Sequence, residues 1–212
     1  MNVTERLVAR RGVDAITIRD ITAAARTDVT AVNYHFGSKQ HLIETTLRRT
    51  LALLSAEREP FIDALEGKDK PSARDIACCI VLPASRRAAA GTTRGRQREA
   101  FISALVRHSD FAGIVAAETE RDIGRYMTAL ERILPNVPPD VLITRLLYAI
   151  TLAHQSSARE LRWTQRWHAH YGAESNADPA EPLIDFIACG LAGGRPGAVP
   201  RRRVSGSRSR ER

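Results

Sequence analysis

Residues 17–36 of this 212-residue chain read TIRDITAAARTDVTAVNYHF, and they decide the fold of its N-terminal part. Thr17 is a typical helix N-cap, and Asp20 stands three residues later, close to the arrangement of a capping box. The apolar residues that follow recur at helical spacing on one face: Ile18, Ile21 and Ala25. Arg26-Thr27-Asp28 interrupts this pattern, and its aspartate can cap a second helix. The segment is predicted to be a helix, a three-residue turn and a shorter second helix.

This layout is typical of a helix-turn-helix, in which the second helix enters the major groove of DNA and its first residues meet base edges. Small side chains at the start of that helix let the backbone approach closely. Thr30 can donate or accept a hydrogen bond, and Val29 or Ala31 can touch a thymine methyl group. Asn33 can pair with adenine or bind a phosphate. We expect these residues to read sequence, with both roles open for Asn33.

Other side chains in this segment are suited to the DNA backbone. Tyr34 and His35 offer hydrogen bonds to phosphate oxygens, which set register without reading sequence, although His35 could be an ordinary helix-face histidine. Lys39 begins the next helix, where the N-terminus also favours phosphate. Arg19 can reach the backbone or a neighbouring base, whereas Thr17 is expected mainly to cap. Four apolar residues are assigned to the core on spacing: Ile18, Ile21, Val32 and Phe36.

Together with Gly37-Ser38-Lys39, which follows it, the segment resembles the TetR family of transcriptional regulators. The resemblance covers residues 3–47 and rests most on VNYHFGSK, residues 32–39, which is a highly specific run. Further matching residues are Arg11-Gly12, Thr17-Ile18-Arg19-Asp20-Ile21 and Ala25. The chain departs from the family in the turn, where Arg26 and Thr27 stand in place of a glycine followed by an apolar residue. Its first helix is also short, with little chain before it.

The resemblance implies an all-α protein with a three-helix DNA-binding head, joined to an all-helical ligand-binding and dimerisation domain. We place the head at residues 1–46 and the helical domain at residues 47–192. Two helices per subunit, expected at 140–160 and 181–192, would form a four-helix bundle between two copies. A small molecule bound inside the domain would change the spacing of the two heads through the helix 39–56. Since aromatic residues are only 5% of the chain, an aliphatic pocket is expected.

Hydrophobic spacing predicts helices along the rest of the chain and no strand. The expected helices are Thr4–Arg11, Lys39–Ala56, Phe61–Glu66, Ala73–Leu82, Arg98–His108, Phe111–Leu134, Val141–Leu161 and Pro182–Leu191. Pro60 and Pro83 are expected to mark helix ends, because proline lacks the N–H that a helix interior needs. Residues 84–96 could be helix and then loop. Residues 193–212 are rich in Gly, Pro, Ser and Arg and are predicted to be a disordered basic tail.

The net charge of +8 is concentrated at the two ends of the chain. Residues 1–49 carry a net charge of +3 and residues 201–212 carry +5, so the middle is balanced. A basic N-terminal segment suits a polyanion such as DNA, because cations that neutralise phosphates release condensed counterions. A solvated basic surface without a partner would have the same composition. For the tail, we favour a passive role over a nonspecific clamp on DNA.

The composition argues against several other classes of protein. Hydrophobic residues are 43% and charged residues 26%, and no stretch approaches a membrane span, so no membrane partner is expected. No basic-then-apolar leader opens the chain, which leads us to expect a cytoplasmic protein. Glycine-rich phosphate loops are absent, and the three cysteines fit neither a disulfide framework nor a metal site. We therefore expect no cofactor and no metal. Four residues could line a cavity but are better explained by packing: His154, Tyr148, Trp163 and Trp167.

The leading hypothesis is a ligand-responsive transcriptional regulator that binds double-stranded DNA. We expect a repressor that binds a palindromic operator as a homodimer and is released by a small-molecule effector. The alternative is a helical protein that binds a small molecule or a partner and has weakened DNA binding, as Arg26-Thr27 and the short first helix suggest. An enzyme is disfavoured, since no nucleophile–base set or pair of catalytic acids stands out. The effector and its binding residues are not identifiable from the sequence.

Overall fold

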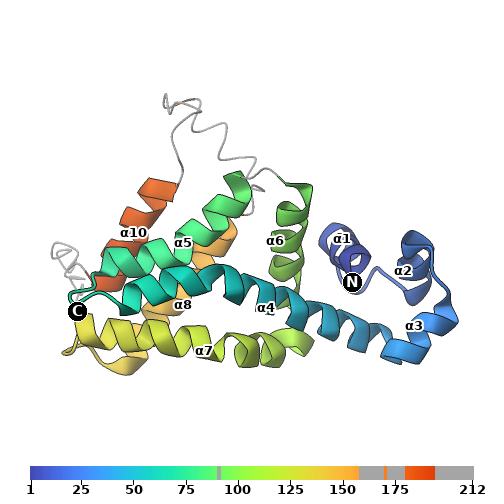
Figure 1. Ribbon diagram of the computed structural model, residues 1–212, viewed down its shortest axis with the longest axis horizontal. Coiled ribbons are helices and arrows are strands. Elements are labelled where there is room, and N and C mark those ends of the chain that lie inside the picture. The colour runs from blue at the N-terminus through green and yellow to red at the C-terminus, as the bar shows by residue number, and fades with distance from the viewer. Residues whose placement is uncertain (90–91, 158–169, 171–179, 194–212) are drawn as a thin grey trace, which may run out of the picture.

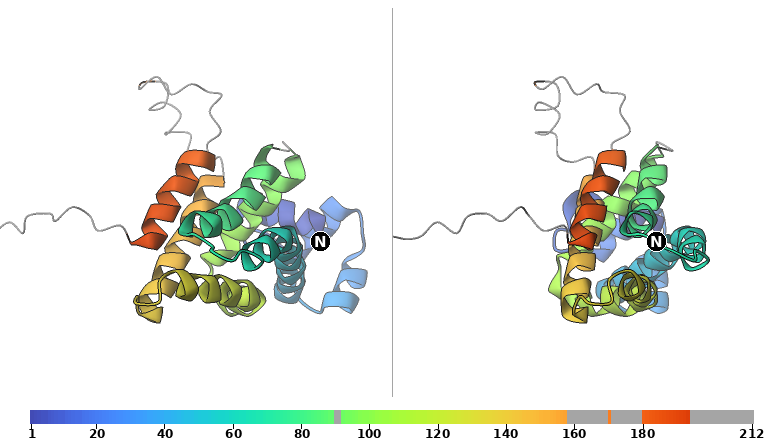
Figure 2. Two further views of the ribbon diagram at one scale, coloured as in Figure 1. Left: turned by 60° about the vertical axis from the view of Figure 1, so that its left-hand side comes forward. Right: turned by 90° about the vertical axis from the view of Figure 1, so that its left-hand side faces the viewer.

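The computed structural model describes residues 1–89, 92–157, 170 and 180–193, and over these residues it is all-α, without a strand. The helices are α1 (Asn2–Arg11), α2 (Ile18–Ala25), α3 (Val29–Phe36), α4 (Lys39–Glu66), α5 (Ala73–Ala89), α6 (Thr93–Val106), α7 (Ser109–Ile133), α8 (Pro139–Ser157) and α10 (Ala180–Ala192). The all-α prediction is confirmed. The short helices α1 to α3 form a head at one end, and α4 runs from the head along the body beside α7 (Figure 1). At the other end of the body, α8 and α10 lie side by side (Figure 2).

The helix-turn-helix is built by side-chain caps at the positions that the sequence indicates. Thr17 and Asp20 form a full capping box, in which the Asp20 N–H donates to Thr17 Oγ1 over 3.1 Å and the Thr17 N–H donates to Asp20 Oδ2 over 2.8 Å. The Asp28 carboxylate accepts the Thr30 N–H over 2.6 Å at the start of α3. Ser38 caps α4 in the same way. These caps satisfy donors that a helix N-terminus otherwise leaves free, and they fix where each helix begins.

The turn between α2 and α3 holds a non-glycine residue in the left-handed backbone conformation. Arg26 has φ 54° and ψ 48°, and it is the one non-glycine residue with positive φ in the described part of the chain. Its N–H donates to the Ala23 carbonyl over 3.3 Å, and the Thr27 N–H donates to the Thr22 carbonyl over 3.1 Å. A residue with a β-carbon is destabilised by about 1–2 kcal/mol in this conformation. The turn therefore forms without a glycine, but under backbone strain.

The prediction that a helix ends before Pro60 is wrong, because α4 continues through this residue to Glu66. Pro60 and Ala56 are exposed, so the carbonyl that loses its helical donor lies at a solvated surface. Ion pairs with α7 also hold this part of α4. Arg125 bonds the carboxylates of Asp63 and Glu66, each over 2.6 Å. Contacts with a neighbouring helix thus outweigh the local effect of the proline.

The same prediction at Pro83 is also wrong, because α5 continues to Ala89. Pro83 is buried, and it leaves the Cys79 carbonyl without its helical donor. The Tyr126 hydroxyl of α7 donates to that carbonyl over 3.4 Å. Burial raises the pKa of Tyr126 well above its usual range, so the hydroxyl stays protonated and able to donate. A side chain from another helix thus replaces part of the bond that the proline removes.

The remaining helix ends lie close to the expected ones, with one clear exception. α6 begins at Thr93 rather than at Arg98, because the Thr92 side chain accepts a backbone N–H and caps the helix there. Three predictions lie outside the described residues: the extension of α8 over residues 158–161, the packing of Trp163 and Trp167, and the tail over residues 194–212.

Two clusters of buried apolar side chains hold the molecule together, and α4 contributes to both. The head cluster joins Leu7 of α1 to Leu47 of α4 and continues into the body through Phe101 of α6 and Phe111 of α7. The body cluster joins the far end of α4 to α5, α7, α8 and α10. The head therefore packs on the body through α6 and α7, in addition to the covalent connection through α4.

Replacing Arg26 by glycine is expected to stabilise the protein, because glycine adopts the left-handed conformation without strain. The gain should be about 1 kcal/mol, which corresponds to about 2–4 °C in melting temperature for a chain of this size. Arg26→Ala is the matched control, since it removes the guanidinium but keeps the β-carbon and hence the strain. Thermal unfolding followed by circular dichroism measures both variants. Equal melting temperatures for the two would contradict the strain argument.

Candidate functional site

The helix α3 turns an apolar face to the head and a polar face to solvent. Val32 and Phe36 are half-buried against the head cluster. The opposite face carries five exposed residues: Thr30, Ala31, Asn33, Tyr34 and His35. Tyr34 is 85% exposed, and its ring contacts the His35 ring edge-on at 5.4 Å between centroids. The structure therefore gathers five of the predicted DNA-contacting residues on one free surface, which we call the α3 surface. Val29 lies at its edge and is half-buried.

The two aspartates that cap the helices of the head are ionised at neutral pH. A hydrogen bond from the Thr17 hydroxyl lowers the pKa of the Asp20 carboxyl. The backbone N–H of Thr30 lowers the pKa of the Asp28 carboxyl in the same manner. A hydrogen bond to the charged form favours that form. Both caps are therefore present under the conditions in which the protein would meet DNA.

The helix α2 supplies two further predicted contacts, and their surroundings differ. The Thr17 hydroxyl donates to Asp20 Oδ2 over 2.6 Å and accepts the Asp20 N–H. The cap therefore uses this hydroxyl both as a donor and as an acceptor. Arg19 is exposed, and its guanidinium has no ion-pair partner in the described part of the chain. Thr17 is thus first a structural residue, as expected, whereas Arg19 is free to reach a ligand.

Lys39 lies at the start of α4, but its ammonium group turns inward. Nζ donates to the carbonyl of Val13 over 3.2 Å and to the carbonyl of Ile16 over 3.1 Å. These carbonyls belong to the loop between α1 and α2, so Lys39 ties the start of α4 to the loop that precedes α2. An ammonium group has three donors, and two are engaged here. Sequence reasoning assigned Lys39 to phosphate and did not foresee this contact.

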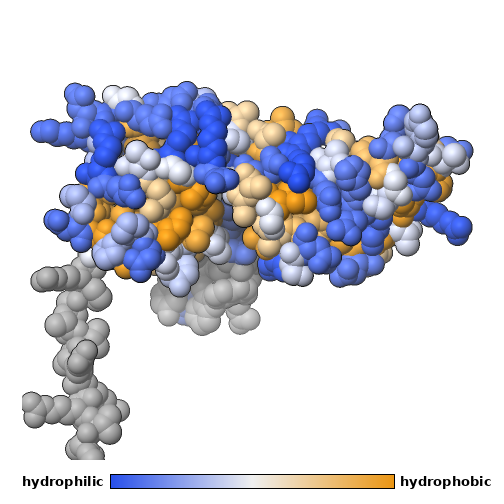
Figure 3. Space-filling model, turned by 90° about the horizontal axis from the view of Figure 1, so that it is seen from below, coloured by the Kyte–Doolittle hydropathy of each residue, from blue (hydrophilic) through white to orange (hydrophobic). Residues whose placement is uncertain are grey.

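The body contains a partly open cavity of about 710 Å³ bounded by α4, α5, α6, α7 and α8. Much of its wall is aliphatic, and six of its lining residues are Leu51, Leu54, Ile80, Ile102, Ile123 and Ile150. Tyr126 is the one aromatic residue among the described lining residues, as expected for an aliphatic pocket. Seen from below, apolar patches interrupt the hydrophilic surface in the left and middle parts of the molecule (Figure 3). A cavity of this volume falls in the range that holds drug-sized molecules.

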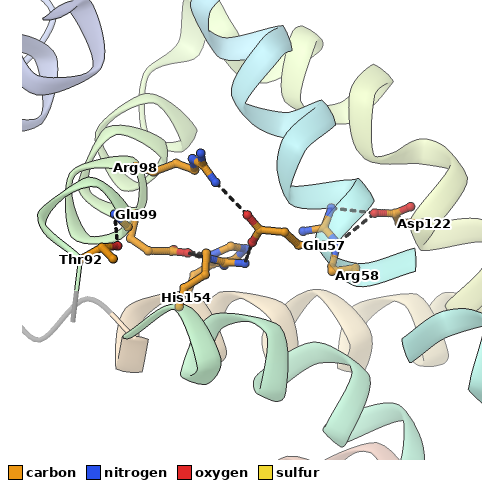
Figure 4. A network of polar contacts seen from close by, with 9 residues as sticks. Glu57, Arg58, Thr92, Arg98, Glu99, Asp122 and His154 are labelled. Atoms are coloured by element: carbon orange, nitrogen blue, oxygen red, sulfur yellow. Dashed lines mark hydrogen bonds and ion pairs between the residues drawn. The ribbon is translucent and has the colours of Figure 1, made fainter. Parts of the chain in front are cut away.

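An ion pair between α4 and α7 forms part of the cavity wall (Figure 4). Arg58 donates to Asp122 Oδ2 through Nε over 2.9 Å and through Nη2 over 2.6 Å. Ser55 Oγ donates to Oδ1 of the same carboxylate over 3.0 Å. Both charged groups are largely buried, so loss of either partner would leave an uncompensated charge inside the protein. The pair therefore fixes α4 against α7 beside the cavity.

A second set of ion pairs links α4, α5 and α6 (Figure 4). Arg87 Nη1 lies 2.6 Å from a Glu57 oxygen, and Arg87 Nε lies 3.0 Å from Glu99 Oε1. Arg98 donates to the other Glu57 oxygen over 2.8 Å. Two arginines thus face two carboxylates, and the set presents no excess charge to the cavity.

Glu99 and His154 meet where α6 approaches α8. Glu99 is only 5% exposed, and its Oε2 lies 3.5 Å from Nδ1 of His154. Burial alone would raise the pKa of Glu99, but the contacts with His154 and Arg87 outweigh burial and lower it to about 2. Glu99 is therefore a carboxylate at neutral pH. It faces the imidazole of a residue that lines the cavity.

Sequence reasoning expected an aliphatic pocket in the helical domain but did not identify its lining residues, since they come from five helices and each resembles an ordinary helix-face residue. It explained His154 by packing, whereas the structure places this residue in the cavity wall. The available signal was an imidazole group at the end of an apolar stretch, as at His154. Which groups would meet across the interior could not be told from their positions in the chain.

Metal and membrane sites find no support in the part of the chain that the structure describes. No group of three or more His, Cys, Asp or Glu residues there is placed to hold a metal ion. No single helix among those residues is long and apolar enough to cross a membrane, and only the pair α6 and α7, bent by 115°, passes that test together.

Burial raises the pKa of both Cys78 and Cys79, the latter to about 12, so these thiols are poor nucleophiles.

Comparison with known proteins gives the same assignment for both parts of the chain. A family model described as bacterial regulatory proteins, tetR family, matches residues 1–46. A model described as tetracyclin repressor-like, C-terminal domain, matches residues 78–190. A Rhodococcus sp. protein assigned to TetR-family transcriptional regulators has a similar fold, with a TM-score of 0.60 and 16% identity over 90% of this chain and 94% of that chain. The structure of Probable transcriptional regulatory protein RHA5900 matches with a TM-score of 0.50 and 19% identity over 91% and 95%. Curated protein sequences give no match.

The head and the body together define a helix-turn-helix DNA-binding protein with an all-helical C-terminal domain. The chain belongs to the TetR family and is a transcriptional regulator of that family. The prediction made from VNYHFGSK is thereby confirmed, and the C-terminal match extends it well beyond residue 47.

Replacing Lys39 by methionine is expected to destabilise the protein by about 2 kcal/mol, because two hydrogen bonds from a charged donor are lost. Lys70→Met, which removes an exposed lysine from the loop between α4 and α5, controls for the change in net charge. Chemical denaturation measures both variants. Unchanged stability of Lys39→Met, together with weaker and less salt-dependent DNA binding, would instead support the phosphate contact.

Proposed function

We propose that this regulator is a repressor that binds a palindromic operator as a homodimer and leaves DNA when a small molecule enters the body cavity. The α3 surface carries the DNA-binding part of this proposal. Its five exposed residues can contact bases or phosphates, and Asp28 fixes the start of the helix that bears them. A helix presented in this way fits a major groove. The partly open apolar cavity supports the ligand-responsive part.

Each residue of the surface has a proposed role that follows from its chemistry and exposure. The base-reading positions are Val29, Thr30, Ala31 and Asn33, with Val29 contributing from the edge. Tyr34 and His35 bind phosphate, and Arg19 reaches the backbone or a neighbouring base from α2. Thr17 and Lys39 act mainly by holding the helices of the motif in place.

The proposed dimer interface is the outer face of α8 and α10. Tyr148 of α8 is 72% exposed and Phe186 of α10 is 67% exposed. Leu147, beside Tyr148, is 49% exposed and also lines the cavity. Large exposed apolar side chains on these two neighbouring helices support an interface there. A second copy seated on this face would bury them and form the expected four-helix bundle.

The helix α4 is the proposed connection between the cavity and DNA. Leu51, Leu54 and Arg58 line the cavity, and Lys39 at the other end of the helix holds the loop between α1 and α2. An occupant that moves α4 would therefore move the head. The effector needs only a different affinity for the two head spacings to shift the equilibrium between them.

Selection of bound duplexes from a random DNA pool at near-physiological salt tests the proposal. We expect a shared palindrome whose half-sites lie one helical turn apart, about 34–36 Å, or a multiple of it. The recovered operator then serves as the assay for the effector. Recovery of no shared sequence, with binding lost as salt rises, would overturn the proposal in favour of a helical binding protein that grips DNA only by charge.

Two substitutions on the α3 surface are expected to act differently on DNA. Tyr34→Ala should weaken binding to every sequence by about tenfold, because one hydrogen bond to a charged phosphate is lost. Thr30→Val keeps the shape of the side chain but removes the hydroxyl. It should therefore change the difference in binding free energy between the preferred base and the other bases by about 1–3 kcal/mol. Fluorescence anisotropy with the operator and its single-base variants measures both effects. Uniform losses across all sequences for both variants would contradict the assigned roles.

Placing a charge on the outer face of α8 or α10 is expected to produce monomers. Tyr148→Glu and Phe186→Glu should each shift the molar mass measured by light scattering towards that of one chain, because a carboxylate would be buried at the interface. Leu53→Glu, at an exposed apolar position of α4, is the matched control and should leave the mass unchanged. Dimers that persist in both interface variants would place the interface elsewhere.

A further inference from the structure

The charged groups in the cavity wall are already neutralised by one another. Arg58 is paired with Asp122, and Arg87 is shared between Glu57 and Glu99. An ion entering the cavity would lose its hydration without finding an unpaired partner in the buried wall. Arg107 and Glu120 also line the cavity, but both are exposed and their charges are opposite. The interior therefore favours an uncharged occupant.

Three hydroxyl groups of the lining are also engaged. Thr119 Oγ1 donates to the Val115 carbonyl over 2.7 Å, within α7. Thr151 Oγ1 donates to the Leu147 carbonyl over 2.8 Å, within α8. The Tyr126 hydroxyl donates to the Cys79 carbonyl over 3.4 Å. These donors offer little to an occupant, because each would first have to leave its partner.

His154 differs from these groups, because half of its imidazole is uncommitted. Nδ1 faces the Glu99 carboxylate at 3.5 Å, and the Glu99 side chain is buried behind it. A carboxylate beside one ring nitrogen favours the tautomer that carries the proton on that nitrogen. Nε2 is then an acceptor on the other side of the ring, and within the described chain it has no hydrogen-bond partner. Because His154 lines the cavity, this acceptor is available to an occupant.

The surroundings of His154 make this part of the cavity its polar corner. Ser103 of α6 lines the cavity, is half-buried and lies one helical turn from Glu99. Glu99 Oε2 and His154 Nδ1 are both buried and face each other at 3.5 Å, so Nε2 is the imidazole atom that this corner leaves for an occupant. The rest of the wall is mainly aliphatic.

We infer that the cavity binds an uncharged, largely apolar molecule that carries one hydroxyl group, and that this hydroxyl donates to Nε2 of His154. This inference rests on the proposed function, since it takes the cavity to be the effector site. The apolar body of the ligand would fill the aliphatic wall. The single hydrogen bond would fix its orientation.

Three matched probes test the inference: 2-naphthol, naphthalene and 2-naphthoate. They share one ring system and differ in carrying a hydroxyl, no polar group or a negative charge. Calorimetry or equilibrium dialysis at about pH 7.5 keeps the naphthol neutral and gives the dissociation constant of each. The protein is tested as the full chain, in the wild type and in His154→Phe, His154→Gln and Arg107→Gln. Melting temperatures check that each variant is folded.

We expect the wild type to bind 2-naphthol about fivefold more tightly than naphthalene, and 2-naphthoate most weakly. His154→Phe should abolish the preference for naphthol but still bind naphthalene, which shows that the cavity is intact. His154→Gln retains an acceptor and should restore part of the preference. Arg107→Gln should change nothing for the two neutral probes.

Three results would overturn the inference. These are tightest binding of 2-naphthoate, an equal preference for naphthol in the wild type and His154→Phe, and loss of naphthol binding in Arg107→Gln. In each of these the cavity still binds a ligand, so the proposed effector site stands and only its chemistry changes. Failure of every probe to bind would remove both the inference and the effector site. DNA selection would remain as the independent test of operator binding.

Discussion

The structure depends on one helix, α4, because its buried side chains belong to both the head cluster and the body cluster. Its first part contributes Leu42, Leu47 and Leu54 to the head cluster, and its last part contributes Ile62 and Leu65 to the body cluster. With 28 residues, α4 is roughly 42 Å long, so a displacement at one end is carried as a rigid element to the other. The part of α4 between these two groups of residues includes Arg58 and borders the cavity. Leu51 and Leu54 of the head cluster line the cavity as well, so any occupant touches α4 beside the core that anchors the head.

Ion pairs around the cavity decide its shape as well as its chemistry. Charges buried without partners are strongly destabilising, so Arg58 and Asp122 hold α4 to α7 wherever the fold is intact. Arg87 does the same between α5 and its two acids on α4 and α6. Such pairs add little net stability over an apolar core, but they are directional, and a helix cannot slide without breaking them. The aliphatic side chains between these ion pairs give the cavity its volume, but they offer no directional contact to a ligand.

The head reaches its geometry by shorter-range means. Each of its helices after the first starts at a side-chain cap, and Lys39 closes the motif by binding two carbonyls of the loop that precedes α2. The strained backbone at Arg26 is tolerated because backbone hydrogen bonds to the end of α2 hold one side of the turn and the Asp28 cap of α3 holds the other. The consequence is a rigid α3 surface whose polar side chains make few contacts with the rest of the protein. Rigid presentation of free polar groups is what a DNA-reading helix requires.

The sequence by itself determined the helix-turn-helix and its caps, because capping and helical spacing involve residues within four positions of each other. It also indicated the exposed residues of α3, since Val32 and Phe36 could be assigned to the core by period alone. Only the tertiary structure decided that α4 and α5 continue through Pro60 and Pro83, because Arg125 and Tyr126 of α7 provide the compensating contacts. It alone turned Lys39 inward and assembled the cavity with His154 and Glu99. These features depend on contacts between residues far apart in the chain, and neither spacing nor propensity specifies which of them meet.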